Sequence, residues 1–341
     1  MESFAQRLIA WQRNHGRHDL PWQGVDAYRV WLSEIMLQQT QVTTVIPYYQ
    51  RFIASFPDIT ALAAASADDV LAHWSGLGYY ARGRNLHQAA RIMVAQYQGE
   101  FPREFAQIVE LPGVGRSTAA AICALAYHQR HAILDGNVKR VLARHRGIEG
   151  WYGNKPVETR LWQQAEALLP PHDIATYTQA MMDLGATVCT RSKPRCGVCP
   201  VQGDCVALAS QRVDQLPTPR PGKAVPERQV VMLLLMHGND ILLEKRPASG
   251  IWGGLWSLPQ FNDEAVAQNW FAQSGMQASG GEQLAAFTHT FTHFKLHITP
   301  LRIELERKPV KAEQGGRMWL SVEEALGAAI PTPVRKLLKV L

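Results

Sequence analysis

The sequence of 341 residues predicts a mostly α-helical N-terminal region followed by a smaller α+β domain. Apolar residues recur at helical spacing through residues 1–205, with short breaks that contain Gly, Pro or Asp. The stretch SQRVDQLPTPRPGKAVPER, residues 210–228, holds four prolines and no apolar periodicity, which is typical of a linker. The run VVMLLLM is then followed by HGND and ILLEKR, a pattern that predicts a β-hairpin.

The same patterns predict the individual elements. In the N-terminal region we expect helices over residues 2–14, 27–39, 43–54, 67–74, 83–97, 103–110, 116–127, 137–145, 157–168 and 173–188. After the hairpin we expect a helix at 263–273, strands near 283–289 and 292–304, and helices at 321–328 and 333–340.

Composition narrows the class of protein. Hydrophobic residues make up 46 % of the chain, and no apolar run reaches the roughly 18 residues of a membrane-spanning helix. The N-terminus lacks a basic segment followed by an apolar one, so we expect a soluble, cytoplasmic protein with no membrane partner. The net charge of +6 and the pI of about 9.1 fit a nucleic-acid partner, although many solvated surfaces are equally basic.

Four of the five cysteines gather in one short segment. Their order is Cys189-x6-Cys196-x2-Cys199-x5-Cys205. In an intracellular chain such clustering favours a metal centre over two disulfides. A zinc ribbon usually has two C-x2-C knuckles and this segment has one, so we favour an iron–sulfur cluster over zinc. The segment also carries Arg191, Lys193 and Arg195, and we interpret it as a structural loop that holds cations toward phosphates.

Residues 111–126, LPGVGRSTAAAICALA, predict a helix preceded by two glycines. Gly113 and Gly115 allow close approach to the backbone, and the unpaired N–H groups of the helix that starts near Ser117 suit a phosphate. With the helix at 103–110 this makes a helix–hairpin–helix. An ordinary corner between two helices is the alternative, but the Pro-Gly-Val-Gly turn favours contact with a DNA backbone. Such a contact does not distinguish one base sequence from another.

Two carboxylates stand in different environments. Glu34 lies in the helical stretch YRVWLSEIMLQQTQV, where apolar neighbours should make it reluctant to ionise; this suits a general acid, with a plain surface glutamate as the alternative. Asp135 precedes a helix rich in Arg and Lys, where it is either an ordinary N-cap or an anion beside a developing positive charge. Glycoside cleavage through an oxocarbenium-like state requires such a pair.

The motifs LPGVGRSTA and LDGNVKRVLAR and the cysteine spacing together resemble the helix–hairpin–helix DNA glycosylases with an iron–sulfur cluster, the family of endonuclease III and MutY. Four further stretches resemble the MutY-type adenine DNA glycosylases in particular. These are LPW, WLSEIMLQQTQV, GLGYYARGRNL and QAMMDLGATVCTRSKP, and the resemblance covers nearly the whole chain.

The resemblance implies a fold and a cofactor. It implies a mostly α helix–hairpin–helix glycosylase region over residues 1–209, in which the loop 189–205 binds one [4Fe–4S] cluster. The linker 210–228 would join this region to an α+β Nudix-like domain over residues 229–341, which in the family recognises 8-oxoguanine.

The resemblance also implies a reaction. In relatives that cleave the strand, a lysine at the place of Ser117 forms a Schiff base with the sugar; a hydroxyl cannot, so base removal alone is implied. Adenine opposite 8-oxoguanine or guanine would be flipped out of the duplex. Glu34 would protonate its N7, Asp135 would stabilise the oxocarbenium ion and Asn137 would help to hold the geometry. We give the nearby Lys139 no catalytic role.

Further residues match DNA contacts of the family. Gln38 and Tyr79 match residues that enter the base stack beside 8-oxoguanine, and core packing suits Tyr80 better than Tyr79. Gln179 matches a position that lines the adenine pocket.

The C-terminal region departs from the Nudix hydrolases. It has Glu264 but no cluster of glutamates on one helix to hold Mg²⁺, so we expect no pyrophosphate hydrolysis. Phe291, Thr292 and His293 stand where the family commonly has Phe-Ser-His, and the extra methyl of threonine stiffens the side chain at the proposed lesion contact. His289, His293 and His297 do not predict a metal site, because positions i and i+4 of a strand are roughly 13 Å apart.

The expected partner is double-stranded DNA that contains adenine opposite 8-oxoguanine or guanine, bound by a monomer, with repair proteins as possible partners of the linker. Two other functions stay open. The chain could be an endonuclease III-like glycosylase for oxidised pyrimidines, which Ser117 and the C-terminal domain argue against, or a lesion-binding protein without catalysis.

Overall fold

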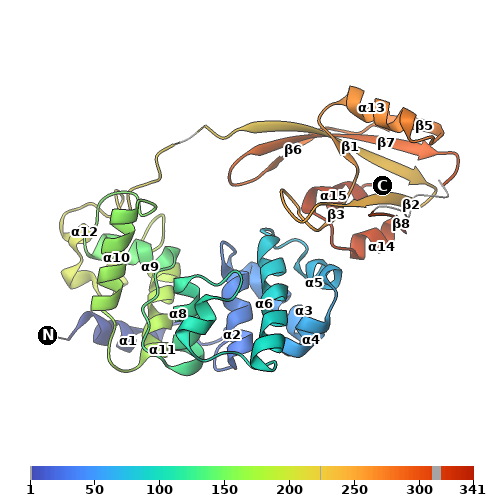
Figure 1. Cartoon of the computed structure of the whole chain (residues 1–341). Helices are drawn as coiled ribbons and strands as arrows, with labels where there is room; N and C mark the ends of the chain where they lie inside the picture. Colours follow the sequence, from blue (N-terminus) through green and yellow to red (C-terminus); the bar gives the residue numbers. More distant parts are fainter. Residues whose placement is uncertain (1, 223, 309–315) are drawn as a thin grey trace. The chain divides into compact units, whose positions relative to one another are not determined.

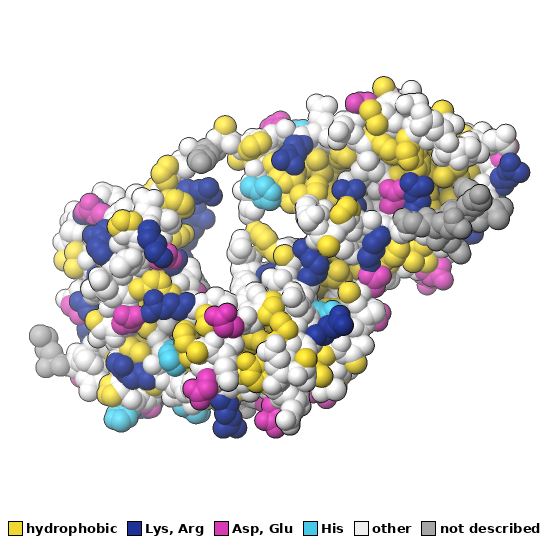
Figure 2. All heavy atoms as spheres, in the orientation of Figure 1, with side chains coloured by type: hydrophobic (Ala, Val, Ile, Leu, Met, Phe, Trp, Pro, Cys, Tyr) yellow, Lys and Arg dark blue, Asp and Glu magenta, His cyan; other side chains and the backbone are white. Residues whose placement is uncertain are grey.

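The computed structural model of the chain describes residues 2–222, 224–308 and 316–341 (Figure 1). Within these ranges, no helix combines the length and the apolarity needed to cross a bilayer. On the face drawn in Figure 2, Lys and Arg side chains are scattered among acidic and hydrophobic ones. The positive charges on this face are therefore dispersed and do not form one continuous basic patch.

The contacts within the chain divide it into two compact units. Residues 1–64 and 85–222 form a helical unit, and residues 65–84 and 223–341 form a C-terminal unit. The sequence pattern predicted that residues 65–84 belong to the N-terminal helical region. In the structure they pack with the C-terminal part of the chain, so that the long helix α6 (Ala81–Tyr97) begins in one unit and continues into the other.

The helical unit contains helices that apolar periodicity predicts, together with two that it does not. The unexpected helices are α4, with the six residues ITALAA, and α12, with the four residues VALA, and both are too short to display an amphipathic repeat. Besides α6, the helices of this unit are α1 (Phe4–His15), α2 (Ala27–Leu37), α3 (Val42–Ser55), α4 (Ile59–Ala64), α7 (Phe105–Val109), α8 (Arg116–Tyr127), α9 (Gly136–His145), α10 (Lys155–Ala167), α11 (Ile174–Asp183) and α12 (Val206–Ala209).

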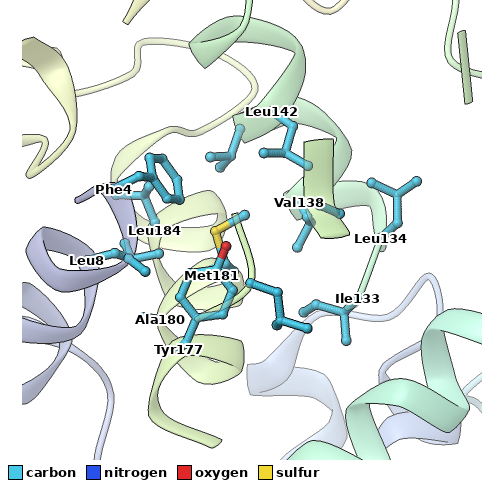
Figure 3. Close-up of a cluster of buried hydrophobic side chains, with 14 of the residues drawn as sticks. Phe4, Leu8, Ile133, Leu134, Val138, Leu142, Tyr177, Ala180, Met181 and Leu184 are labelled. Atoms are coloured by element: carbon cyan, nitrogen blue, oxygen red, sulfur yellow. The ribbon is translucent and has the colours of Figure 1, made fainter. Parts of the chain in front are cut away.

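Helices α1, α9 and α11 share a hydrophobic core (Figure 3). Leu8 of α1, Leu142 of α9 and Met181 of α11 are buried there. Ile133 and Leu134, which lead into α9, point into the same core. The N-terminal end of α9, where Asp135 stands, is therefore fixed by buried apolar contacts on both sides of that residue.

The helix expected over residues 173–188 changes its winding part of the way along. It is an α-helix to Asp183 and continues as a π-helix over Leu184–Val188. A wider turn of this kind re-aims the chain and is frequent at functional sites. Gly185 lies in this turn against α9, where a Cβ atom added to it would come within 2.5 Å of the Cβ of Asn137.

The C-terminal unit is a mixed sheet with helices around it. Strand β1 pairs in parallel with β7, in a register that runs from Glu227 opposite Lys295 to Met236 opposite Glu304. The order along the sheet is β3-β2-β1-β7-β5, with β4 on β1, β6 on β7 and β8 on β2. The strands are β1 (Glu227–His237), β2 (Asp240–Lys245), β3 (Trp256–Ser257), β4 (Gln260–Phe261), β5 (Ala278–Gln283), β6 (Phe287–Thr290), β7 (Lys295–Leu305) and β8 (Arg317–Ser321); the helices are α5 (Ala67–Trp74), α13 (Glu264–Gln273), α14 (Val322–Gly327) and α15 (Thr332–Leu338).

Several strands differ from the expectation. The single strand expected near 283–289 is two strands, β5 and β6, and both pair with β7. Strand β8 was not expected, because its sequence shows no clear alternation of apolar and polar residues. In the structure every one of its residues is partly buried. Strand β1 begins inside the stretch interpreted as a linker, because its pairing with β7 reaches back to Glu227.

The first part of the proline-rich stretch is packed rather than free. Leu216 is buried, and its carbonyl accepts a hydrogen bond of 2.7 Å from Nε of Arg144. The backbone N–H of Gly150 donates to the hydroxyl of Thr218 at 3.0 Å. Residues 219–222 and 224–226, in contrast, are exposed.

Residues 65–84 are attached to the C-terminal unit by polar contacts. The carboxylate of Asp68 pairs with Lys245 and accepts a hydrogen bond of 3.0 Å from the indole of Trp256. Ser75 donates to the carbonyl of Ile330 at 2.8 Å and accepts from Arg335 at 3.0 Å. This segment thus belongs with the sheet by contact, although it is distant from it in the sequence.

The contact of Gly185 with Asn137 generates a prediction for stability. We expect Gly185→Ala to destabilise the helical unit by about 1–3 kcal/mol, since the new methyl group would overlap both the side chain and the backbone of Asn137. Urea unfolding of the purified chain measures the change. Gly136→Ala is the matched control: a Cβ there meets no atom within 4 Å, and alanine favours a helix, so its midpoint should equal or exceed that of the parent. A Gly185→Ala variant as stable as the parent would contradict the prediction.

Candidate active site and iron–sulfur centre

Glu34 lies on α2, which begins at the N-cap Asp26 and carries buried residues on most of its surface. Val30, one turn before Glu34, and the adjacent Ile35 are each 2 % exposed. Part of the Glu34 surface is accessible, but the surrounding protein removes most of its hydration, and this burial raises the pKa of Glu34 to about 8. The negative charge of Asp135 raises the pKa further, so the structure brings the two carboxyl groups into one site.

Asp135 is both an N-cap and a member of this site. One of its oxygens accepts a hydrogen bond of 2.8 Å from the backbone N–H of Val138, which caps α9, and the other accepts from the amide of Asn137 at 3.3 Å. Burial raises the pKa of Asp135, while these hydrogen bonds and the charge of Arg140 act in the opposite direction. The two interpretations of Asp135 made from sequence are compatible, because the cap fixes the carboxylate beside Glu34.

Arg140 connects this end of α9 to the cysteine segment. Its Nη2 atom donates to the side-chain oxygen of Asn137 at 2.8 Å and to the carbonyl of Gly185 at 2.6 Å. Its Nε atom donates to the carbonyl of Cys189 at 2.7 Å. The orientation of Asn137 is therefore set by an arginine that also holds the first cysteine of the segment.

The four cysteines expected to bind a cluster meet around one small cavity of about 30 Å³. All four are free thiols, which excludes the two disulfides. The buried Arg144 donates to Sγ of Cys189 at 3.4 Å and to the carbonyl of Thr190 at 2.7 Å. Four thiols around one cavity supply the ligands that an iron–sulfur cluster requires.

Arg191 and Lys193 lie exposed on the cysteine segment, and Lys193 adopts a positive φ of 51°. The carbonyl of Arg191 accepts a hydrogen bond of 3.2 Å from Arg144, so the backbone of the exposed stretch is anchored from beneath. The segment therefore presents two cations on a fixed backbone, as a phosphate contact requires.

The glycine hairpin lies between α7 and α8. Gly113 has a φ of +80°, which favours glycine, and a Cβ there would approach Asn85 to 3.0 Å. Gly115 is the N-cap of α8, makes no side-chain cap, and has open space around its Cα. The first N–H groups of α8 are thus not covered by a capping side chain, which suits an anion.

Ser117 and Gln38 lie next to the hairpin. The hydroxyl of Ser117 accepts a hydrogen bond of 2.9 Å from the backbone N–H of Leu134, the residue before Asp135. The amide of Gln38 is 3.4 Å from both the carbonyl of Gly113 and the hydroxyl of Thr118. The hairpin and the carboxylate pair are therefore joined through short contacts.

Tyr79 belongs to the C-terminal unit and stands apart from its neighbour in exposure. Tyr79 is 41 % exposed and has a φ of +48°, whereas Tyr80 is 8 % exposed. The guanidinium of Arg82 lies 5.6 Å from the centre of the Tyr79 ring. A large exposed aromatic side chain on a strained backbone is available for stacking.

Phe291, Thr292 and His293 form the turn between β6 and β7. Phe291 stacks on the buried Phe294, with ring centres 4.4 Å apart, while Thr292 and His293 are exposed. His297 pairs with Glu227 at 2.9 Å instead of contributing to a metal site. The turn thus presents a hydroxyl and an imidazole on a fixed aromatic base.

Three residues with evident roles in the site were not identified from the sequence. One of them, Asp183, contacts Gln179, which was identified from the sequence. The amide of Gln179 donates to the fully buried Asp183 at 2.8 Å, and Asp183 pairs with Arg17 at 2.7 Å. Gln179 also lines a cleft of about 640 Å³ whose wall includes Trp22 and Val30. Arg17 and Asp183 lie far apart in the sequence, as do Arg140 and its partners Gly185 and Cys189. The local signals were two spacings of about one helical turn, Gln179-x3-Asp183 and Asn137-x2-Arg140.

Comparisons with known proteins agree with this geometry. Residues 32–167 match the HhH-GPD superfamily of base excision DNA repair proteins, residues 189–205 match the iron–sulfur binding domain of endonuclease III, and residues 230–340 match the NUDIX domain. The loop 189–205 therefore binds a [4Fe–4S] cluster.

Solved structures share the fold of the helical part. A thermostable thymine-DNA glycosylase superposes with a TM-score of 0.55 at 28 % identity, over 61 % of this chain and 95 % of that one. Endonuclease III in a non-covalent complex with DNA superposes with a TM-score of 0.52 at 18 % identity, over 61 % of this chain and 94 % of that one.

Curated relatives match the whole chain. The adenine DNA glycosylase of Buchnera aphidicola subsp. Acyrthosiphon pisum is 38 % identical over 98 % of this chain and 97 % of the relative. The adenine DNA glycosylase of Mus musculus is 34 % identical over 99 % of this chain and 77 % of the relative. Because relatives of this name match nearly the whole chain at 34 % to 38 % identity, the chain belongs to the adenine DNA glycosylases of base excision repair.

Proposed function

We propose that this glycosylase removes adenine paired with 8-oxoguanine or guanine and leaves an abasic site in an uncut strand. The observation that carries the proposal is the meeting of Glu34 and Asp135 in one enclosed site, with a pKa of about 8 for Glu34. A carboxyl group with that pKa is mostly protonated at neutral pH and can act as a general acid.

The reaction begins when adenine is flipped out of the duplex. Glu34 donates its proton to N7 of the base, and the bond between N9 and the sugar then breaks with its electron pair leaving on adenine. The oxocarbenium ion that remains is stabilised by the carboxylate of Asp135, which Val138 and Asn137 hold in place. Water adds at the anomeric carbon, and the carboxylate of Glu34 takes the proton that this water loses.

Strand cleavage is absent from this proposal because the site lacks its nucleophile. Ser117 occupies the position where a lysine would form an imine, and its hydroxyl already accepts a hydrogen bond from Leu134. The absence of a Schiff-base lysine also argues against an endonuclease III-like lyase. Lys139 is paired with Glu158 at 2.9 Å and receives no catalytic role.

The remaining residues hold the DNA. Gly113 and Gly115 let a phosphate approach the first turn of α8, and Arg191 and Lys193 contribute charge beside a second phosphate. When bound, the [4Fe–4S] cluster cross-links the loop that carries those two cations.

Recognition of the opposite base uses a second set of residues. Gln38 and Tyr79 enter the stack beside 8-oxoguanine, and Phe291, Thr292 and His293 contact the lesion. The protein acts as a monomer on double-stranded DNA in the cytoplasm. Because Leu216 and Thr218 are held by contacts with the helical unit, a repair protein that binds the linker would use the exposed residues 219–222 and 224–226.

The first prediction concerns the substrate and the product. Purified protein should release adenine from a duplex with A opposite 8-oxoguanine, and more slowly with A opposite G, and the strand should break only after alkali. Duplexes with A:T and G:C pairs are the controls and should stay intact. Strand breaks without alkali would indicate a lyase, and release of oxidised pyrimidines instead of adenine would indicate the alternative substrate class.

The second prediction concerns the proton donor. Glu34→Gln should lower the single-turnover rate of adenine release by about 100- to 10,000-fold, because an amide N–H is too weak an acid to transfer its proton to N7. Binding to the same duplex should change little. Glu264→Gln, an exposed glutamate in the first turn of α13, is the matched control and should keep the parental rate. Unchanged turnover in Glu34→Gln would remove Glu34 from the mechanism.

The third prediction concerns pH. The rate of adenine release should be nearly flat below pH 8 and should fall about tenfold per pH unit above it, because the protonated fraction of a group with a pKa of about 8 falls in that way. The rate should fall with rising pH because the protonated form of Glu34 is the active one. Single-turnover rates between pH 5.5 and 9.5 would test this (both limits are chosen to bracket the pKa by about 1.5 units or more). A rate that rises through this range would mean that Glu34 acts only as a base.

A further inference from the structure

Resting on the proposed excision of adenine, we propose that Asp183 and Arg17 are positioning residues that set which edge of the Gln179 amide faces the extruded base. This pair thereby selects a purine that has an amino group at C6. Neither residue touches the reacting atoms in this proposal; both act through Gln179.

The first step is that Asp183 is saturated with donors. Its side chain is fully buried at the end of α11. Oδ1 accepts hydrogen bonds from Nε of Arg17 at 2.7 Å and from the amide of Gln179 at 2.8 Å, and it also lies 2.7 Å from Nη2 of Arg17. Oδ2 accepts from the backbone N–H of Arg17 at 2.9 Å. An aspartate that receives three hydrogen bonds and pairs with a guanidinium is an acceptor only.

The second step is that an acceptor-only partner fixes the amide. Glutamine has an N–H₂ edge and a carbonyl oxygen, and either can face a neutral partner. Beside the Asp183 carboxylate only the N–H₂ edge is favourable, so the carbonyl oxygen of Gln179 is directed away from Asp183. Gln179 is 7 % exposed, and the solvent-accessible part of it lines the cleft shared with Trp22 and Val30.

The third step is the fit of this cleft to a base. Its volume of about 640 Å³ admits a purine, and Val30 lies on α2 one turn before the proton donor Glu34. A carbonyl oxygen accepts a hydrogen bond from the C6 amino group of adenine. It repels the C6 carbonyl oxygen of hypoxanthine, since two acceptors then face each other without a proton between them.

Arg17 is itself held in place from the other side of the cleft. Its carbonyl accepts a hydrogen bond of 2.8 Å from the side chain of Gln23, the residue after Trp22. His18, which also lines the cleft, is 2.9 Å from the carbonyl of Gln12. The wall that carries Trp22 and the wall that carries Gln179 are therefore joined through Arg17 and Asp183.

The test uses three bases opposite 8-oxoguanine: adenine, hypoxanthine and unsubstituted purine, which has no group at C6. Single-turnover rates are measured for the parent and for Asp183→Asn, and each is expressed relative to purine in the same variant. The adenine-to-purine ratio should fall about three- to tenfold in Asp183→Asn, and the hypoxanthine-to-purine ratio should rise, because a neutral side chain holds the N–H₂ edge of Gln179 and the Arg17 guanidinium less strongly than a carboxylate does and so lets the Gln179 amide turn over. Ratios are used because a general loss of structure slows all three bases alike.

Asp173→Asn is the matched control. Asp173 is the N-cap of the same helix and pairs with Arg13 at 2.9 Å, but it does not contact Gln179. Both ratios should stay at parental values in this variant.

The outcomes separate the proposals. Equal slowing of all three bases in Asp183→Asn, or unchanged ratios, overturns the positioning role. If Asp183→Asn loses the visible absorbance of its cluster, Gln179→Leu replaces it; that variant should lower the adenine-to-purine ratio without favouring hypoxanthine, and unchanged ratios there also overturn the proposal. Failure of the parent to release adenine at all would overturn the proposed function instead.

Discussion

The proposed chemistry depends on two carboxyl groups, Glu34 and Asp135, that lie in one largely buried site. Glu34 comes from α2 and Asp135 from the start of α9, and each makes ionisation of the other less favourable. Hydrogen bonds resolve the conflict: Asp135 receives donors from Val138 and Asn137, whereas burial keeps the proton on Glu34. In the proposed mechanism, one pair of like residues is thereby divided into an acid and an anion.

The support for Asp135 comes from three directions, and each has a distinct physical origin. Apolar packing of Leu134 and Val138 fixes the backbone on either side of it. Ser117 ties the preceding residue to the helix of the glycine hairpin, so the element proposed to bind a phosphate also sets the position of Asp135. Arg140 joins Asn137 to the carbonyl of Cys189. The iron–sulfur loop and the carboxylate pair are therefore parts of one hydrogen-bonded framework.

The sequence predicted most of what depends on local pattern. The cysteine spacing, the two glycines before α8, and an acid among apolar helical residues are each readable within a few positions. It did not reveal Arg17 as the partner of Asp183, because those residues are 166 positions apart and a charged pair leaves no periodic signal. Strand β8 and the early start of β1 were missed for a related reason: pairing with a neighbouring strand, not alternation of apolar residues, creates them. The division of 173–188 into an α-helix and a π-helix arises from contact with Asn137 and Arg140, which no local preference encodes.

The assignment of residues 65–84 to the C-terminal unit changes how recognition is organised. Asp68, Ser75 and Arg84 each bond to groups between residues 245 and 335, so the loop that carries Tyr79 is held by the sheet domain. Of the residues proposed to contact 8-oxoguanine, Tyr79 in that loop and Thr292 with its neighbours belong to this unit, whereas Gln38 belongs to the helical unit. Glu34 and Asp135 also belong to the helical unit. The proposed contacts to the opposite base therefore come from residues of both units, whereas the proposed acid and anion come from the helical unit alone, and the sequence distance between residues 65–84 and the sheet is what hid this division from local patterns.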